Sequence, residues 1–301
     1  MANAVPVERA QPAVRASARR QWLAKYARRE IVPRLLLIPL CGFYLLPFYW
    51  MLVNALKTNE ELSIYPPSWF PDEIAWSNFS RAVEVFPFWR FLGNTSLITV
   101  FTVIGVALTN PIVAYGFSRI EWPGRDTIFY LVLATVFIPY PALIVALFDI
   151  FAQLGWVNTF KPLIVPFFFC FIPSPFWIFL LRQFFLRIPH EISDAARLDG
   201  ASELRILYQI IMPQSWPALS AVSLFAALHA WNDFLGPLLY LQDTSKYTLS
   251  IGLTFFQSQS RYDIQFNLLM AASALVILPV VLIFLSFQRA FVEGVTVSGI
   301  K

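Results

Sequence analysis

The sequence predicts an all-α integral membrane protein with six membrane-spanning helices. Hydrophobic residues make up 58% of the 301-residue chain and charged residues only 13%, whereas soluble domains carry about 25% charged residues. The apolar residues fall into six runs of roughly 20 residues, the length of helix that crosses a bilayer. Both cysteines, Cys41 and Cys170, lie inside these runs as packing residues. This composition argues against a disordered, nucleic-acid-binding or disulfide-stapled protein.

Each of the six runs contains a proline, which in water would argue against a helix. In lipid, neighbouring helices can satisfy the backbone groups that a proline frees, so prolines there indicate bends within a packed bundle. We therefore expect a bundle of bent helices and not a set of isolated anchors. The predicted spans are Leu35–Leu56, Phe91–Phe117, Ile128–Phe148, Pro162–Leu181, Pro217–Tyr240 and Ile264–Phe287.

Lysine and arginine are distributed unevenly across the predicted topology. When alternate connecting segments are assigned to opposite sides, sixteen of these residues lie on the side of both termini and six on the other. Both termini are therefore predicted to be cytoplasmic. Residues 1–34 form a basic cytoplasmic tail and 35–301 the six-span domain. The tail is either an interfacial helix, with Trp22 and Tyr26 at the lipid headgroups, or a solvated segment that only fixes the topology.

The sequence lacks the motifs of nucleotide, metal and hydrolytic sites. It contains no G-x-x-x-x-G-K-[ST], H-E-x-x-H, C-x-x-C or G-x-S-x-G pattern. Its two histidines, His190 and His229, are predicted at different depths of the membrane. We therefore expect a chain that is not an enzyme and binds no metal or other cofactor, so the energy for uphill transport must come from a partner or an ion gradient.

The cytoplasmic segment 182–216, between the fourth and fifth spans, is predicted to hold structure of its own. Pro189 is suited to begin a first helix and Gly200 to end it, and Ser202 is suited to cap a second helix that ends near Pro213. Four apolar residues at helical spacing predict one buried face on this second helix: Leu204, Leu207, Tyr208 and Ile211.

The first of these helices carries two small residues, Ala195 and Ala196, within a ring of charged ones. This shape suits a groove on another protein, although an amphipathic segment at the membrane surface commonly packs beneath its own bundle or on lipid. The charged residues are Glu191, Asp194, Arg197 and Asp199.

The same segment resembles the signature loop of permease subunits in binding-protein-dependent ABC importers, whose pattern is roughly E-A-A-x-x-D-G-A followed by I-x-L-P. The matching residues are Asp194-Ala195-Ala196, Asp199-Gly200-Ala201 and Ile210-Ile211-Met212-Pro213. Asp194 replaces the usual Glu, and Met212 the usual Leu. Two more segments, Trp231–Leu238 and Phe291–Lys301, resemble the maltose-type carbohydrate permeases of this family.

The resemblance covers nearly the whole chain and implies the type I importer permease bundle in the bacterial cytoplasmic (inner) membrane. It implies that the signature loop docks on a cytoplasmic ATPase subunit, which would bind ATP and Mg²⁺ in place of this chain. The partners implied are a second permease, normally a dissimilar chain, two ATPase subunits and an extracytoplasmic solute-binding protein facing 57–90 and 241–263. The residues assigned to ATPase coupling are Glu191, Asp194, Ala195, Ala196, Arg197, Asp199, Gly200 and Ala201.

The predicted function is carbohydrate import driven by a partner ATPase. One alternative is an ABC importer of a non-sugar solute. Another is a gradient-driven secondary transporter, which six spans and an intramembrane aspartate could support but which leaves the signature segment unexplained. A membrane-embedded enzyme is disfavoured because the sequence shows no catalytic constellation.

A second candidate site lies in the fifth predicted span, at His229, Trp231, Asn232 and Asp233. Residues four apart share one face of a helix, and ionisable groups in hydrocarbon are functional candidates because they are costly to hold there. In one interpretation this face lines the solute path, with Trp231 as an aromatic platform for a sugar. In the other, His229 and Asp233 pair to hold helices together, or water reaches Asp233 near the outer interface.

Overall fold

The computed structural model describes residues 32–171, 173–258 and 265–296, which form helices and turns without any β-strand. Both interpretations of the basic tail fall largely on residues outside this part of the chain. Four segments are long and apolar enough to cross a membrane, and two bent helix pairs bring the number of candidate spans to as many as six. The four are α2 (Val32–Ala55), α5 (Phe88–Ser118), the segment Lys161–Phe185, and α17 (Phe266–Thr296), of which Phe266–Gln288 forms the span.

The third predicted span is bent at its proline into two helices. The helix α6 (Arg125–Ala134), continued by the 3-10 turn η2 (Thr135–Phe137), meets α7 (Tyr140–Gln153) at 97°. The bend falls where Ile138, in extended conformation, precedes Pro139, because a residue before proline disfavours the helical region. Other prolines, at 47, 111 and 279, lie inside continuous helices.

The fifth predicted span is also interrupted. The helix α13 (Trp216–Asn232) ends before Asp233, whose backbone is extended, and α14 (Leu235–Tyr240) begins two residues later. A bend of 87° separates α13 from the preceding segment Glu203–Gln214. The predicted span Pro217–Tyr240 is therefore made of two helices with a break at Asp233.

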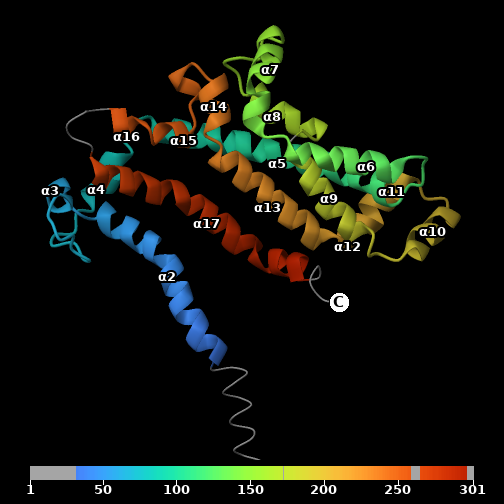
Figure 1. The fold of residues 1–301 in the computed structure, drawn as a ribbon, viewed down its shortest axis with the longest axis horizontal. Coiled ribbons are helices and arrows are strands. Elements are labelled where there is room, and N and C mark those ends of the chain that lie inside the picture. Colours follow the sequence, from blue (N-terminus) through green and yellow to red (C-terminus); the bar gives the residue numbers. More distant parts are fainter. Residues whose placement is uncertain (1–31, 172, 259–264, 297–301) are drawn as a thin grey trace, which may run out of the picture.

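The spans pack around α5, which lies beside α9 (Ser174–Phe185) and α13, while α17 packs on α13 and on α2 (Figure 1). Trp177, Leu181 and Val222 belong to a buried cluster between these central helices. α5 comes so close to the fourth span that a side chain at Gly105 would collide with the ring of Phe168. α2 extends away from the bundle with most of its apolar side chains exposed (Figure 1).

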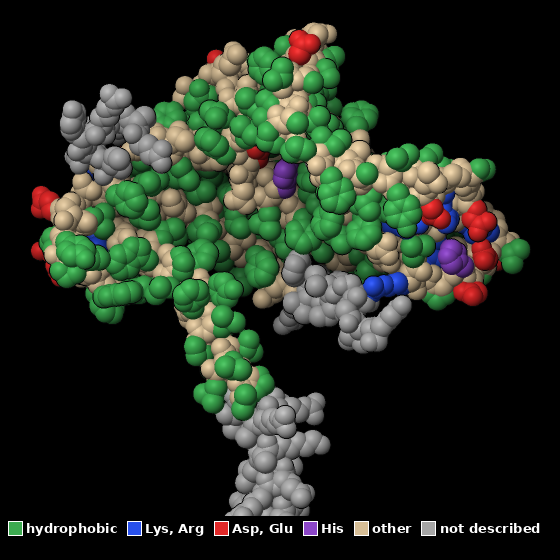
Figure 2. Space-filling model, in the orientation of Figure 1, with side chains coloured by type: hydrophobic (Ala, Val, Ile, Leu, Met, Phe, Trp, Pro, Cys, Tyr) green, Lys and Arg blue, Asp and Glu red, His purple; other side chains and the backbone are tan. Residues whose placement is uncertain are grey.

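Hydrophobic side chains cover most of the visible surface, and charged ones gather towards its ends (Figure 2). This is the distribution expected of a chain surrounded by lipid. The connecting elements are short: α3 (Asn59–Leu62), α4 (Ser77–Ala82), α8 (Lys161–Ile164), η3 (Val165–Phe169), α10 (His190–Leu198), α11 (Glu203–Ile206), η4 (Leu207–Ile211), α12 (Met212–Gln214), η5 (Thr244–Lys246), α15 (Leu249–Gly252) and α16 (Phe255–Ser258).

Candidate functional site

The short helix α10 projects at one end of the molecule, where Figure 2 shows acidic and basic side chains together. As predicted, it follows Pro189 and ends in a turn at Gly200, whose φ of +81° is left-handed. Glycine adopts this conformation without the steric cost of a Cβ atom. Ser202 then caps α11, because its Oγ accepts the N–H of Arg205 at 3.4 Å.

The predicted apolar face of the second helix is only half correct. The side chains of Ile206, Leu207 and Ile211 are fully buried, whereas Leu204 is 59% exposed and Tyr208 is 42% exposed. The reason is that residues 207–211 form a π-helix, η4. Its i→i+5 hydrogen bonds widen the turn and move the buried face away from the 3.6-residue pattern.

α10 turns one side inward and the other outward. Ser193 and Ala196 are buried, while Ala195 is exposed and Leu198 is 90% exposed. The outward side of the helix therefore exposes small and apolar side chains that are flanked by acidic residues. The other outward residues assigned to coupling are Glu191, Asp194, Asp199 and Gly200, and Ala201 is half-buried.

Arg197 is half-buried at the edge of this outward face. Its guanidinium turns back, donating at 2.7 Å to Glu203 Oε1 from Nε and to Asp194 Oδ1 from Nη1. The Tyr115 hydroxyl, at the end of α5, donates to Glu203 Oε2 at 2.5 Å. We call Tyr115, Asp194, Arg197 and Glu203 the polar knot. Tyr115 lies 88 residues from Glu203 in the sequence, and no sequence motif indicates this contact.

The hydrogen bonds within the polar knot shift its charged groups away from their ordinary pKa values. Hydrogen bonding from Arg197 lowers the pKa of the Glu203 carboxyl, and the bond to Glu203 raises the pKa of the Arg197 guanidinium. Both groups are therefore held in their charged forms. At Arg119, just beyond α5, burial lowers the pKa of the guanidinium.

Two more arginines join the end of α5 to the segment that leads into α10. Arg119 donates to the carbonyl groups of Phe185 and Ile188, the latter at 2.5 Å. Arg182, in α9, donates to the carbonyl of Phe117 at 2.9 Å and to Asp126 at 2.7 Å. The base of α10 is thus attached to α5, α6 and α9 by charge-assisted hydrogen bonds.

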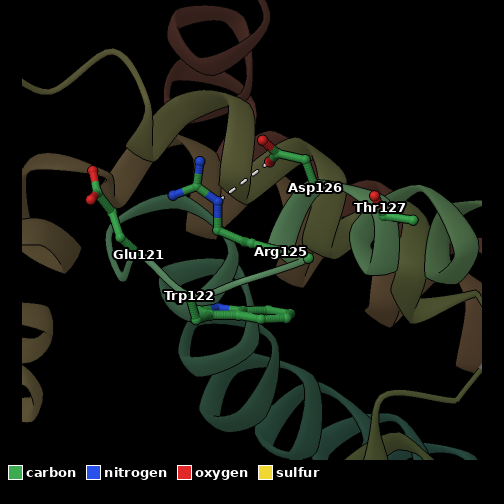
Figure 3. A pocket seen from close by; sticks show the side chains of 6 residues that line it. Glu121, Trp122, Arg125, Asp126 and Thr127 are labelled. Atoms are coloured by element: carbon green, nitrogen blue, oxygen red, sulfur yellow. Dashed lines mark hydrogen bonds and ion pairs between the residues drawn. The ribbon is translucent and has the colours of Figure 1, made fainter.

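A shallow depression of about 390 Å³ lies between α5 and α6 (Figure 3). Arg125 Nε lies 3.3 Å from Asp126 Oδ1, and Glu121 lies on the other side of the Arg125 guanidinium (Figure 3). Since Asp126 also binds Arg182, the depression is an outer part of the same charged end of the molecule. Among the described residues, no group of three His, Cys, Asp or Glu side chains could hold a metal ion.

The structure separates the four residues of the second candidate site. His229 and Asn232 are exposed near the end of α13, and the His229 ring meets the rings of Phe167 and Trp177 edge-on. Trp231, only 6% exposed, donates from Nε1 to the Val276 carbonyl in α17 at 3.2 Å. The expected aromatic platform is therefore wrong for this conformation.

Asp233 follows the last residue of α13 and does not continue its face, which corrects the expectation of one helical face with His229. Its Oδ1 accepts the N–H of Gly236 at 3.0 Å. A carboxylate three residues before an N–H is the arrangement that caps a helix N-terminus. Asp233 therefore starts α14 where α13 ends.

Residues 109–297 match the family model described as "Binding-protein-dependent transport system inner membrane component". The chain belongs to this family. The permease is 32% identical to the arabinooligosaccharides transport system permease protein AraQ of Bacillus subtilis, over 86% of this chain and 91% of that protein. It is 31% identical to the trehalose/maltose transport system permease protein MalG of Thermococcus litoralis, over 91% of this chain and 99% of that protein.

The permease also shares its fold with a bacterial ABC transporter involved in the import of the acidic polysaccharide alginate. A chain of that crystal structure superposes with a TM-score of 0.74 at 22% identity, covering 89% of this chain and 98% of that one. The type I importer permease bundle predicted from the sequence is thus confirmed. The permease is a component of the inner membrane and not an enzyme.

Proposed function

We propose that this permease is the membrane subunit of an ATP-driven importer that carries an oligosaccharide or other carbohydrate into a bacterial cell. Its relatives named above, and the diacetylchitobiose uptake system permease protein NgcG of Streptomyces coelicolor at 32% identity over 89% of this chain, are named for transport of different sugars. The shared chemistry is a polyhydroxylated solute. A non-sugar solute is the runner-up within the same architecture.

The main evidence for the mechanism is the way in which α10 is attached to the rest of the molecule. This helix exposes Ala195 and Leu198 outward while the polar knot and Arg119 fasten its inner side to the end of α5. A helix that is exposed on one side and fixed on the other can transmit a displacement. We infer that α10 docks in a cleft of an ATPase subunit, where ATP and Mg²⁺ would be bound, and that closure of the ATPases moves α5.

The remaining partners follow from the same architecture. A second permease completes the translocation path, and two ATPase subunits bind at the α10 end, which places both termini and the basic tail in the cytoplasm. An extracytoplasmic solute-binding protein delivers the solute to the opposite end. The structure of an alginate ABC transporter in complex with a pentasaccharide-bound periplasmic protein, with a TM-score of 0.63 to this chain, supports the proposed binding-protein partner.

We propose that His229 and Asn232 line the solute path. Both side chains are exposed at the end of α13, where that span is interrupted. Irregular backbone at membrane depth is tolerated where it lines a cavity or is buried in protein. Asp233 shapes the interruption by capping α14.

The test is ATP hydrolysis by the complete complex. The permease is co-expressed with its candidate second permease and ATPase, placed in nanodiscs, and assayed with the binding protein loaded with arabinooligosaccharide, diacetylchitobiose, maltose or trehalose. We expect one of these sugars to stimulate hydrolysis above the level with unloaded binding protein. Uptake into ATP-free liposomes by the permease alone would instead establish a gradient-driven carrier.

A further inference from the structure

In three of the predicted spans, the α-helix is interrupted next to one small cavity. The third breaks at Ile138–Pro139 and the fifth at Asp233. The fourth passes through the 3-10 helix η3 to Cys170, whose φ of 56° is left-handed. Interrupted helices in transporters commonly lie at solute-binding sites, where freed backbone and side-chain groups can meet the solute.

The cavity has a volume of about 40 Å³ and is lined by residues from all three interruptions. This is room for about one water molecule, far below the roughly 300–1,000 Å³ of small-molecule sites. Its lining is mainly apolar and aromatic, including Phe167 and Phe171, with three polar side chains, Tyr140, Asp233 and Tyr240. A mainly apolar lining with a few converging polar groups is typical of ligand sites.

The polar groups of the cavity have capacity for a further partner. Tyr140 Oη and Tyr240 Oη are 3.4 Å apart, a long separation for an O–H···O bond. Each hydroxyl can therefore exchange this weak contact for a solute hydroxyl. Asp233 accepts backbone hydrogen bonds from Gly236, through Oδ1, and from Leu235, and a carboxylate offers about four acceptor positions.

The contacts that close the cavity are few. Within α7 only Phe151 is buried. The rings of Phe148 and Phe151 lie against Tyr240, with centroids 6.2 and 5.2 Å away, beside the Tyr140 hydroxyl contact. Tyr240 itself is held in place by the rest of the fold, because it is 1% exposed and its carbonyl accepts the N–H of Asn158 at 2.7 Å. Movement of α7 away from α14 would therefore enlarge the cavity between the two tyrosines.

We propose that Tyr140, Tyr240 and Asp233 form a solute-contact site that is collapsed in this conformation and receives a carbohydrate ring when α7 moves away from α14. The two hydroxyls and the carboxylate bind the hydroxyl groups of the solute, and Phe167 and Phe171 contribute to the apolar walls. This inference rests on the carbohydrate import proposed above and assigns two tyrosines that the sequence did not single out.

The first test compares Tyr140→Phe and Tyr240→Phe with Tyr130→Phe, a control that removes a hydroxyl from an exposed ring on α6. Import and ATP hydrolysis are measured in the same proteoliposomes with saturating sugar-loaded binding protein. Loss of one hydrogen bond to the solute should lower import about threefold to tenfold, while hydrolysis stays near the control. A parallel fall in both rates, or no change in either, would overturn the proposed contact.

The second test detects the solute directly at Tyr140→Cys in a background where Cys41→Ser and Cys170→Ala remove the native thiols. Sugar-loaded binding protein and ATP should slow maleimide labelling at this position but not in the matched Tyr130→Cys variant. Equal labelling with and without sugar overturns the site. If no sugar stimulates hydrolysis by the unmodified complex, carbohydrate import itself fails, which is a different outcome from stimulated hydrolysis with unaffected tyrosine variants.

Discussion

The two ends of the molecule hold their connecting segments by different chemistry. At the α10 end, half-exposed charged groups reach between elements, as Arg197 does to Asp194 and Glu203. At the opposite end, buried amides do this work: Asn78 donates to the carbonyl of Lys57 at 2.8 Å, and Asn267 donates to Asn78 Oδ1 at 3.2 Å. The ion pairs around Arg197 are half-exposed, whereas the groups that hold the second end are buried.

Lys57, at the end of the molecule opposite α10, is almost completely buried from water. The side chain is 1% exposed, its ammonium donates to the Ser68 carbonyl at 2.5 Å, and it lies 5.0 Å from the ring centre of Trp50. Nearby, Glu61 Oε1 accepts both the Ser68 hydroxyl and the N–H of Asp72. These contacts fold the segment after α2 back onto the end of that helix.

The difference assigns different mechanical roles to the two ends. Water can replace a half-exposed ion pair at little cost, so such contacts can break and form again during a cycle. A buried amide has no water to replace its partner, and its loss costs the full desolvation penalty. We therefore expect the α10 end to move as a lever while the opposite end remains a rigid frame.

The largest effect should come from reversing a charge on the outward side of α10. With Asp194→Lys we expect ATP hydrolysis to lose its stimulation by the loaded binding protein and uptake to fall more than tenfold, because an unpaired charge in an interface costs about 2–5 kcal/mol. The amount of permease in the membrane should stay unchanged. Asp194→Glu, the residue usual in this family, is the matched control and should remain active. Normal uptake by Asp194→Lys would contradict the docking role, and Gly200→Trp should uncouple in the same way.

At the rigid end, Asn267→Ala should lower the stability of the complex by about 1–3 kcal/mol, since it removes the hydrogen bond to the buried Asn78 Oδ1. The Lys57 carbonyl loses one donor and keeps the bond from Asn78. Thermal unfolding in detergent measures the change. Gln214→Ala, which removes an exposed amide bonded to one carbonyl, is the control and should shift the midpoint little. Equal shifts in both variants would remove the distinction between the two ends.

In the polar knot, Glu203→Gln should destabilise the permease by at most about 1 kcal/mol at pH 7, because the pair is partly exposed. Arg197 lowers the pKa of this carboxyl. Its stabilisation is therefore complete above the ordinary carboxyl pKa of about 4.3 and is lost as the pH falls through the lowered value.

The difference in thermal midpoint between the wild type and Glu203→Gln should accordingly be largest near neutral pH and shrink below about pH 4. Tyr115→Phe retains the ion pair and isolates the hydroxyl contribution. A midpoint difference that does not change with pH would show that the carboxylate charge is irrelevant to the polar knot.

Much of the fold could be predicted because membrane spans are encoded by long apolar runs, and α10 because Pro189 and Gly200 mark its limits locally. The prolines of the third and fifth spans predicted bends but not where the helices end. Asp233 with Gly236 and the following proline was a local signal that could have located the start of α14. The π-helix η4 carries no comparable local signature.

The candidate sites were predictable only where their contacts are local. The outward face of α10 could be predicted from residues that are consecutive in the sequence. The inward turn of the Arg197 side chain depends on Glu203, six residues away. The contact between Tyr115 and Glu203 and that between Tyr140 and Tyr240 join residues 88 and 100 positions apart. Such pairs depend on how the spans pack. The sequence does not define this packing, because the bundle interior and the lipid-facing side are both apolar.

The smallest effect is expected from the exposed ion pair between Asp243 and Lys246. The ammonium lies 2.8 Å from Asp243 Oδ2, and its hydrogen bond lowers the pKa of that carboxyl. Lys246→Met should leave the thermal midpoint unchanged within error, because an exposed surface pair contributes little and Asp243 Oδ2 keeps its hydrogen bond from Asn158.

Asn158→Gly should give a small but measurable fall in the same assay. Asn158 Oδ1 accepts the N–H groups of Gln242 and Asp243 at 3.1 and 3.0 Å, and its φ of 60° is one that glycine adopts freely. The substitution therefore removes the amide contacts without adding backbone strain. A larger shift from Lys246→Met than from Asn158→Gly would mean that this end, like the α10 end, is held by charge.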